Sequence, residues 1–425
     1  MPVAPDHAAP WFRMEPPAKG NDMMALHIGI AGAGLGGLCL AQGLASAGHQ
    51  VEVFERDPAP VARGQGYRLR IDPDGQHALA AVLSPQANRL FRHSCAAHNQ
   101  VSRFVDTQFR ELDASRPPSW KATSEAGEQD YAGDLSANRQ TLREILGHGL
   151  GDRIRYGQAV QDFAADHGGV DIVLGSGERR RVDLLVGADG VSSRLRARWL
   201  PAAAPADTGA ITLYGKTPLT APVRGALAPA LLEGLTAVVG NGLSLIVEPM
   251  RFRAALPELA REFMPDCRLS AVDDYLYWAF LGDAACLGGA LSREIDAAAL
   301  QQRAATAVRD WHPNLRQMIA LSDIDSLSAR PVWMACAIPD WPTSRFTLLG
   351  DAIHAMSPAG GLGANTALVD AARLADALAR IEHIDALPAA LRGYEDDMRA
   401  RAARALQATR EGALRLRNGM DAASA

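Results

Sequence analysis

The chain has 425 residues, a formal net charge of −5 and 48% hydrophobic residues. It is long enough to bury a large core and to hold two closely packed lobes. Basic and acidic residues are interspersed, without a basic stripe interleaved with aromatic residues, so nucleic acid is excluded as an expected partner.

The reactive residue types exclude further classes. An odd number of scattered cysteines argues against a disulfide framework and favours a cytoplasmic location. The sequence has no H-E-x-x-H, no paired Cys/His spacing and no G-x-S-x-G, so we expect no metal ion and no serine-hydrolase chemistry. The five cysteines are Cys39, Cys95, Cys267, Cys286 and Cys336.

The N-terminal region offers two interpretations. Residues 1–24 are polar and contain prolines, which predicts a flexible tail. Residues 25–48 are nearly uncharged, so a signal peptide or membrane anchor is the alternative. A spanning helix needs about 20 apolar residues, whereas several glycines interrupt this stretch. We therefore expect no membrane segment.

The first motif is a strand, a glycine loop, a helix and a second strand. Residues 27–31 predict a buried strand, 38–47 a helix and 50–54 another strand, with Glu55 at its end. This is the context that a dinucleotide-binding G-x-G-x-x-G requires.

Each glycine of this loop has an expected task. Gly32 allows a tight turn, Gly34 lets the backbone approach a pyrophosphate, and Gly37 lets helix and strand pack closely. Glu55 lies where a carboxylate would accept ribose hydroxyls. A nicotinamide-dependent dehydrogenase that uses this motif alone is one alternative.

A helix is predicted from residue 139 to about 150, with Asn138 as its N-cap. Arg139 then lies in the first turn, where the helix dipole disfavours a cation. We expect an anionic group to hold it there; the alternative is a solvated arginine.

The middle motif follows a hairpin. Residues 169–174 alternate as a half-buried strand, 175–178 form a turn, and 182–186 predict a fully buried strand. That strand runs into Gly187-Ala188-Asp189-Gly190. A carboxylate at the carboxyl end of a parallel strand lies where such sheets bind their cofactor.

The late motif is also a buried strand followed by a carboxylate. A strand over 346–349 ends in Gly350-Asp351, a glycine-rich loop spans 357–365, and a helix is predicted from about 366 to 378. The carboxylate suits a polyol, and the helix N-terminus suits an anion. Contacts at the beginning, middle and end of the chain predict one long cofactor, a flavin dinucleotide rather than a nicotinamide one.

A second sheet is predicted between the middle and late motifs, from apolar runs at 211–214, 235–239, 243–247 and 275–280. Large side chains there could line an aromatic substrate pocket, with ordinary core as the alternative. These candidates are Tyr214, Met250, Trp278 and Phe280.

Arg68 and Arg70 alternate with Tyr67 and Leu69 after Gly64-Gln65-Gly66, so both arginines point to one face. We expect one or both to meet a substrate carboxylate, a phenolate or the flavin; solvated arginines are the alternative.

Residues 388–420 predict one long helix that braces the two lobes, with a helix for a partner or a dimer as the alternative. Its apolar positions include Leu391, Met398, Leu406 and Leu414.

Taken together, the three motifs resemble the para-hydroxybenzoate hydroxylase family of single-component FAD monooxygenases, over roughly residues 25–420. The resemblance implies an α/β fold, with a Rossmann-like FAD-binding lobe (25–200 and 331–387, with a substrate-side excursion near 65–130) interleaved with a β-sheet substrate lobe (201–330). The helix at 388–420 resembles that of the tetracycline-inactivating branch.

The resemblance also implies which residues contact FAD, while it names no catalytic residue and makes His354 structural. Leu362 departs from the glutamine that many relatives carry in the late loop, so a side-chain hydrogen bond to the flavin is in doubt. The implied FAD contacts are Gly32, Gly34, Gly37, Glu55, Arg56, Arg139, Asp189, Asp351, Pro358, Gly361, Gly363, Ala364 and Asn365.

The implied activity is hydroxylation of a small aromatic or polycyclic substrate, in secondary metabolism, by a monomer or homodimer. NAD(P)H would reduce FAD transiently, and O2 would give a flavin C4a-hydroperoxide. Baeyer–Villiger oxygenation, epoxidation and a flavin-dependent reductase stay open as alternatives, as does a non-catalytic FAD protein. A flavin halogenase is disfavoured because the W-x-W-x-I-P motif is missing; residues 333–339 hold one tryptophan.

Overall fold

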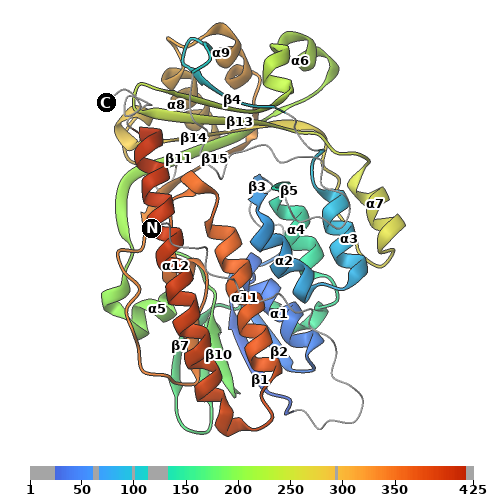
Figure 1. Ribbon diagram of the computed structural model, residues 1–425, viewed down its shortest axis with the longest axis vertical. Coiled ribbons are helices and arrows are strands. Elements are labelled where there is room, and N and C mark those ends of the chain that lie inside the picture. The colour runs from blue at the N-terminus through green and yellow to red at the C-terminus, as the bar shows by residue number, and fades with distance from the viewer. Residues whose placement is uncertain (1–23, 61–66, 98–100, 113–132, 292–294, 418–425) are drawn as a thin grey trace, which may run out of the picture.

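The computed structural model describes residues 24–60, 67–97, 101–112, 133–291 and 295–417. Two large sheets lie at opposite ends of the molecule, with smaller elements between them and the long helix α12 (Leu387–Arg417) running along both (Figure 1). The predicted residues 1–23 of the tail lie outside the described part, as do Gly64 to Gly66.

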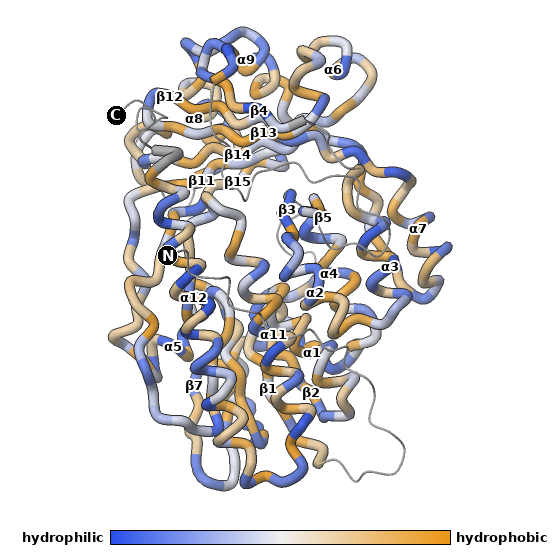
Figure 2. The backbone as a smooth tube through the Cα atoms, in the orientation of Figure 1, coloured by the Kyte–Doolittle hydropathy of each residue, from blue (hydrophilic) through white to orange (hydrophobic). Residues whose placement is uncertain are grey.

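A five-stranded parallel sheet forms one end of the molecule. Residues 28–31, 184–187 and 346–348, in three of its strands, are buried throughout, as expected where both faces are covered. Figure 2 shows hydrophobic residues concentrated in β1 and in the neighbouring helices α1 and α11. In sheet order the strands are β16 (Phe346–Leu348), β10 (Leu184–Gly187), β1 (His27–Ala31), β2 (Gln50–Glu55) and β6 (Ile154–Tyr156).

The helices around this sheet begin earlier than the sequence predicts. α1 (Leu35–Ser46) starts three residues before position 38, because Gly34 already has the extended conformation of an N-cap. α11 (Gly363–Ala379) starts at the end of the glycine loop and not at 366. α4 (Arg139–Gly147) has the predicted Asn138 cap, whose side chain accepts hydrogen bonds from the amides of Gln140 and Thr141.

A six-stranded sheet forms the other end. Adjacent strands of this sheet are antiparallel, except β12 and β4, which pair in parallel. α8 (Ala297–Ala307) and α9 (Pro313–Ala320) pack on one face and close a separate hydrophobic core. In sheet order the strands are β15 (Asp323–Met334), β11 (Ala206–Pro218), β14 (Tyr275–Asp283), β13 (Leu243–Met250), β12 (Gly234–Gly240) and β4 (Val101–Asp106).

Smaller elements complete the fold, and a short antiparallel pair lies between the large sheets. That pair is β3 (Arg68–Ile71) and β5 (Leu135–Asn138). A three-stranded sheet consists of β7 (Val160–Ala165), β8 (Val170–Leu174) and β9 (Arg179–Val182). The remaining helices are α2 (Pro73–Val82), α3 (Pro85–Ser94), α5 (Arg194–Trp199), α6 (Ala221–Ala226), α7 (Leu256–Phe263) and α10 (Asp351–His354).

α12 buries three of its four predicted apolar positions, Leu391, Met398 and Leu406, against the protein, whereas Leu414 is 56% exposed. It packs on α11 and reaches β13 of the six-stranded sheet. The predicted fold class, a Rossmann-like lobe interleaved with a sheet lobe and followed by a long helix, is confirmed. Within the described residues, no helix combines the length and apolarity needed to cross a bilayer.

Candidate active site

The predicted cofactor residues lie in a row along one edge of the parallel sheet. The carboxyl ends of β16, β10, β1 and β2 carry Asp351, Asp189, the glycine loop and Glu55, in that spatial order. Three inter-strand steps of about 4.8 Å make this row about 14 Å long. Ligands of open α/β sheets bind at this edge, so the row suits an extended ligand.

The glycines of the first loop fulfil their predicted packing roles. A side chain at Gly37 would overlap the Gly32 carbonyl oxygen, and one at Gly32, whose φ is +111°, would overlap the Ala188 carbonyl. At Gly34, by contrast, an added Cβ would meet nothing within 4 Å. Gly34 therefore presents bare backbone to open space beside the N-terminus of α1.

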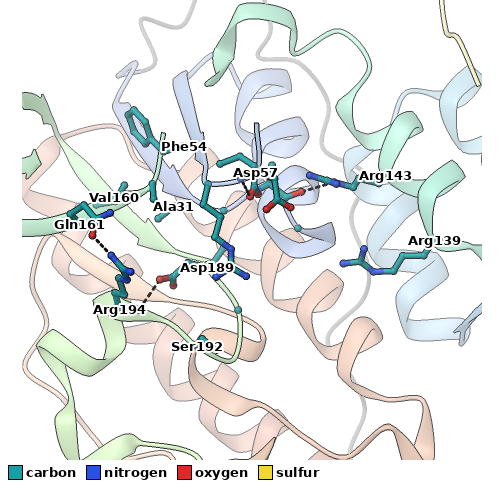
Figure 3. A pocket seen from close by; sticks show the side chains of 18 residues that line it. Ala31, Phe54, Asp57, Arg139, Arg143, Val160, Gln161, Asp189, Ser192 and Arg194 are labelled. Atoms are coloured by element: carbon teal, nitrogen blue, oxygen red, sulfur yellow. Dashed lines mark hydrogen bonds between the residues drawn. The ribbon is translucent and has the colours of Figure 1, made fainter. Parts of the chain in front are cut away.

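A cavity of about 410 Å³ opens in front of this loop (Figure 3). Arg139 and Arg143 approach it from α4, while Asp189 and Arg194 lie on the other side. Six of the predicted cofactor residues line it: Gly32, Gly34, Glu55, Arg56, Arg139 and Asp189.

Two arginines of α4 supply positive charge to the cavity. Arg143, which the sequence analysis missed, is buried and donates to the carbonyl oxygens of Ala33 (3.0 Å) and Pro60 (2.7 Å). Arg139 lies one turn earlier on the same helix face. Its guanidinium lies 5.8 Å from the centre of the Tyr67 ring, and its charge lowers the pKa of Asp351. Arg139 and Asp351 thus interact electrostatically, while an anionic group that holds Arg139 stays a prediction.

The two carboxylates nearest the glycine loop are also held by backbone amides. Glu55 accepts from the amides of Ala33 (2.7 Å) and Asp57 (2.9 Å), and it is 7% exposed. Asp189 accepts from the Arg194 amide at 3.0 Å, and burial raises the pKa of its carboxyl group. Both side chains are fixed at the wall of the cavity.

Asp351 follows β16, where it is accessible to solvent although protein surrounds its carboxyl group. Burial raises its pKa, which the charges of His354 and Arg139 partly offset. His354 itself is fully buried and contacts the Asp370 carboxylate at 2.5 Å through Nε2. Asp370 also pairs with Arg401 of α12 at 3.1 Å, which supports the structural role expected of His354.

The late glycine loop is fastened to β3. Asn365 donates from its side chain to the carbonyl oxygens of Arg70 (3.0 Å) and Gly361 (2.9 Å), and it accepts from the Asp72 amide. Its side chain is therefore used within the protein. Pro358, Gly363 and Ala364 lie in the same loop and helix start and stay predicted cofactor contacts.

The residues present fit a flavin dinucleotide. The N-termini of α1 and α11 have no side-chain cap and no acidic residue in their first turns, so their amides are available to anionic groups. Gly34 leaves room for the close approach of a pyrophosphate. The arginines of α4 supply the matching charge.

One face of the six-stranded sheet continues the site toward α4. Tyr214 on β11 lies against Tyr67, with ring centres 4.7 Å apart, and Tyr67 in turn contacts Arg139. Strand alternation places Tyr275 and Tyr277 of β14 on this same face, because Tyr214 pairs in register with Ala279. We call it the cleft face.

Two of the predicted substrate residues lie on the opposite face, so this expectation is corrected. Trp278 and Phe280 are fully buried in the core under α8 and α9, and Trp278 donates from Nε1 to the Ser322 hydroxyl at 3.0 Å. A one-residue step along a strand reverses the side chain, and the sequence alone could not set this phase. Met250 is on the cleft face but is fully covered by Ala96 and Tyr275.

Neither predicted arginine of β3 is solvated, because each has a carboxylate partner. Arg68 pairs with Glu248 of β13 at 2.7 Å, and Arg70 pairs with Asp134 at 2.6 Å. Arg68 and Glu248 are 14% and 4% exposed in their side chains, and Ser136 donates to Glu248 as well. The first pair joins β3 to the six-stranded sheet, and the second joins β3 to the residue that precedes β5.

Comparison with known proteins agrees with this geometry. A family model described as an FAD binding domain matches residues 289–409, and one described as an NAD(P)-binding Rossmann-like domain matches residues 30–106. The chain is 33% identical over 423 residues to the dual O-methyltransferase/FAD-dependent monooxygenase CTB3 of Cercospora beticola, covering 91% of this chain and 46% of that protein. It is 27% identical to the zeaxanthin epoxidase of Solanum lycopersicum, covering 82% and 47%.

Solved structures show the same fold along their whole length. A protein from Photorhabdus luminescens assigned to the FAD-containing monooxygenases superposes with a TM-score of 0.74 at 27% identity, covering 92% of this chain and 99% of that one. HpxO of Klebsiella pneumoniae, solved with FAD and uric acid, superposes with a TM-score of 0.70 at 20% identity, covering 93% and 90%.

The chain therefore carries an FAD-binding domain with the para-hydroxybenzoate hydroxylase fold, FAD is its cofactor, and over about nine tenths of its length it is similar to FAD-dependent monooxygenases. It spans about half the length of the curated relatives it matches.

Proposed function

We propose that the chain uses NAD(P)H and O2 to hydroxylate an aromatic or polycyclic small molecule bound between the cofactor and the cleft face. The continuity from the cofactor cavity through Arg139, Tyr67 and Tyr214 to the six-stranded sheet supports this proposal. It places flat aromatic side chains beside the cofactor cavity, where a planar substrate can pack.

When bound, FAD would supply the redox and oxygen chemistry, and the chain would supply binding, orientation and exclusion of water. The glycine loop, Arg139 and Arg143 would hold the phosphates, and Glu55 would receive the ribose. Asp351, just after the carboxyl end of β16, would hold the polyol. Hydroxylation consumes one O2, one NAD(P)H and one proton, with one oxygen atom entering the substrate and the other leaving as water.

The test is a screen of aromatic and polyketide-like compounds with the FAD-loaded full chain. We expect at least one compound to stimulate NADPH or NADH oxidation and to gain one oxygen atom, labelled when 18O2 is supplied. Protein that takes up FAD but shows neither stimulation nor label with any aromatic compound would contradict the proposal.

Epoxidation is a second candidate, because the chain is similar over 82% of its length to zeaxanthin epoxidases. The same screen with isolated double bonds separates the two: an epoxide yields a vicinal diol on acid hydrolysis, and a phenol does not. Preferred turnover of alkenes over phenols would favour this candidate.

A further inference from the structure

Lys216 is a charged residue of the cleft face that the proposed function does not yet use. The chain has 43 lysines and arginines, of which only Lys19, Lys121 and Lys216 are lysines. Lys216 is the only lysine among the residues that the structure describes, and it lies on β11 two positions after Tyr214. The period of a strand therefore directs both side chains to the cleft face.

The ammonium group of Lys216 rests on aromatic surface. Its Nζ atom lies 4.7 Å from the centre of the Tyr275 ring, and Tyr277 pairs with Lys216 in the register of β11 and β14. Within the described ranges, this ammonium group has no ion pair and no hydrogen bond. Burial lowers its pKa, and the charge of Asp323 on β15 only partly offsets this effect.

The arginines near this face, unlike the Lys216 ammonium group, have hydrogen-bond or ion-pair partners within the described structure. Arg68 is matched by Glu248, and the exposed Arg330 donates to the Ala329 carbonyl. Lys216 thus combines partial burial with free donor capacity, which makes an incoming anion favourable because it offsets the cost of desolvating the charge.

We propose that Lys216 binds an anionic oxygen of the substrate, either an ionised ring hydroxyl or a carboxylate, while Tyr67 and Tyr214 pack against the ring system. The inference rests on the proposed function and narrows its substrate class to aromatic compounds that are anionic at neutral pH. Lys216 is then a residue that determines specificity, and FAD binding does not depend on it.

Three probes test this by calorimetry on the FAD-loaded full chain. 2-Hydroxy-1,4-naphthoquinone is an anion at neutral pH, 2-methoxy-1,4-naphthoquinone is its neutral ether, and 2-naphthoate presents a carboxylate. We expect at least one anion to bind about tenfold or more tightly than the ether, as for a hydrogen bond to a charged group. Which anion is preferred tells whether the site takes a ring oxygen or a carboxylate.

The variants isolate the charge. Lys216→Met should abolish the preference without changing affinity for the ether, and Lys216→Arg should retain most of it. Arg110→Met is the charge-matched control, because this arginine is 78% exposed and pairs only with Asp106 in the described structure. Equal affinity for anions and ether in the natural chain, or an unchanged preference in Lys216→Met, overturns the inference.

A second measurement on the unaltered chain covers the case in which Lys216→Met does not fold. Reductive methylation followed by mass spectrometry reports each of the three lysines separately. The preferred anion should slow modification of Lys216 relative to Lys19 and Lys121; equal rates with and without the anion overturn the inference. Failure of the proposed function would appear separately, as absent flavin absorbance or absent NAD(P)H oxidation.

Discussion

The two large sheets contribute to the site in different ways. The parallel sheet acts through the loops that follow its strands, where backbone amides, glycines and strand-end carboxylates converge. The six-stranded sheet acts through one of its faces, where every second side chain meets the cleft and the others meet α8 and α9. The contribution of the parallel sheet depends on loop geometry, and that of the six-stranded sheet depends on which side chains point to the cleft face.

This difference explains how specificity can vary within one fold. A loop that must approach a pyrophosphate tolerates few substitutions, because Gly32 and Gly37 abut other backbone atoms and Gly34 leaves room for the ligand. A strand face accepts many side chains without altering the backbone. We therefore expect substitutions in the loops of the parallel sheet to change FAD binding, and substitutions on the cleft face of the six-stranded sheet to change substrate binding.

The largest expected effect tests which face of the six-stranded sheet each side chain occupies. Trp278→Ala should lower the free energy of unfolding by about 3–5 kcal/mol, because it empties a fully buried core site. Tyr214→Ala, on the cleft face, should cost less stability but should weaken substrate binding. Chemical denaturation and substrate titration of both variants measure this; a selective loss of substrate affinity in Trp278→Ala would contradict the assignment of the two faces.

The next effect concerns α12, which contacts both regions. Asp370→Asn should cost about 3–5 kcal/mol, because it removes the carboxylate that pairs with the buried His354 and one of the two carboxylates that pair with Arg401, the other being Asp397. Burial by itself would lower the pKa of His354, but the Asp370 carboxylate raises this pKa above its ordinary value. Burial by itself would raise the pKa of Asp370, but His354 and Arg401 lower this pKa below its ordinary value.

The pH dependence of this difference follows from those two shifts. The contribution of His354 to the free energy of unfolding is complete below the ordinary pKa of histidine, and it is lost as pH rises through the raised pKa. The contribution of Asp370 to the same free energy is complete above the ordinary pKa of aspartate, and it is lost as pH falls through the lowered pKa. The stability difference should therefore be largest between about pH 4 and 6.5 and should narrow at alkaline pH. Asp376→Asn, which removes a partner of the exposed Arg380, is the control. A stability difference that is flat with pH would argue against the charged pair.

A pair of glycine variants sharpens the role of the loop. Gly37→Ala should destabilise the fold by about 1–3 kcal/mol, because its methyl group overlaps the Gly32 carbonyl. Gly34→Ala should leave stability nearly unchanged, since its methyl group meets nothing, but should reduce FAD affinity. Thermal unfolding without FAD and flavin titration separate these effects. Equal losses of stability in both variants would rule out the distinction.

The smallest expected effect is that of Arg143. Arg143→Met should weaken FAD binding about tenfold, or ~1.4 kcal/mol, because it removes a cation and the two hydrogen bonds that hold the glycine loop and Pro60. Flavin fluorescence titration measures this, with the exposed Arg380→Met as the control. Unchanged affinity would show that Arg139 alone supplies the charge.

The parallel sheet was largely predictable because its signals are local. A buried strand followed by glycine or by a strand-end carboxylate is visible in a short segment, as at Gly32 and Asp351. Arg143 escaped notice although it follows Arg139 by four residues, a spacing that places both on one helix face.

The cleft face was less predictable because its phase is set over long distances. Trp278 and Tyr277 are neighbours of similar character, and only the register with β11 and the cover by α8 and α9 decide which of them faces the cleft. The partners of Arg68 and Arg70 could not be predicted either, since Glu248 lies 180 residues further along the chain than Arg68.

The placement of β16 has a consequence for biosynthesis. This strand completes the row of cofactor-binding strand ends, yet it is synthesised only at residues 346–348, after the whole six-stranded sheet. Similarly, β4 must wait for β12, more than a hundred residues later, before it finds its parallel neighbour. Such non-local pairing slows folding. A ribosome-bound fragment that ends before β16 lacks Asp351 and the late loop, so flavin uptake would report that translation has passed this strand.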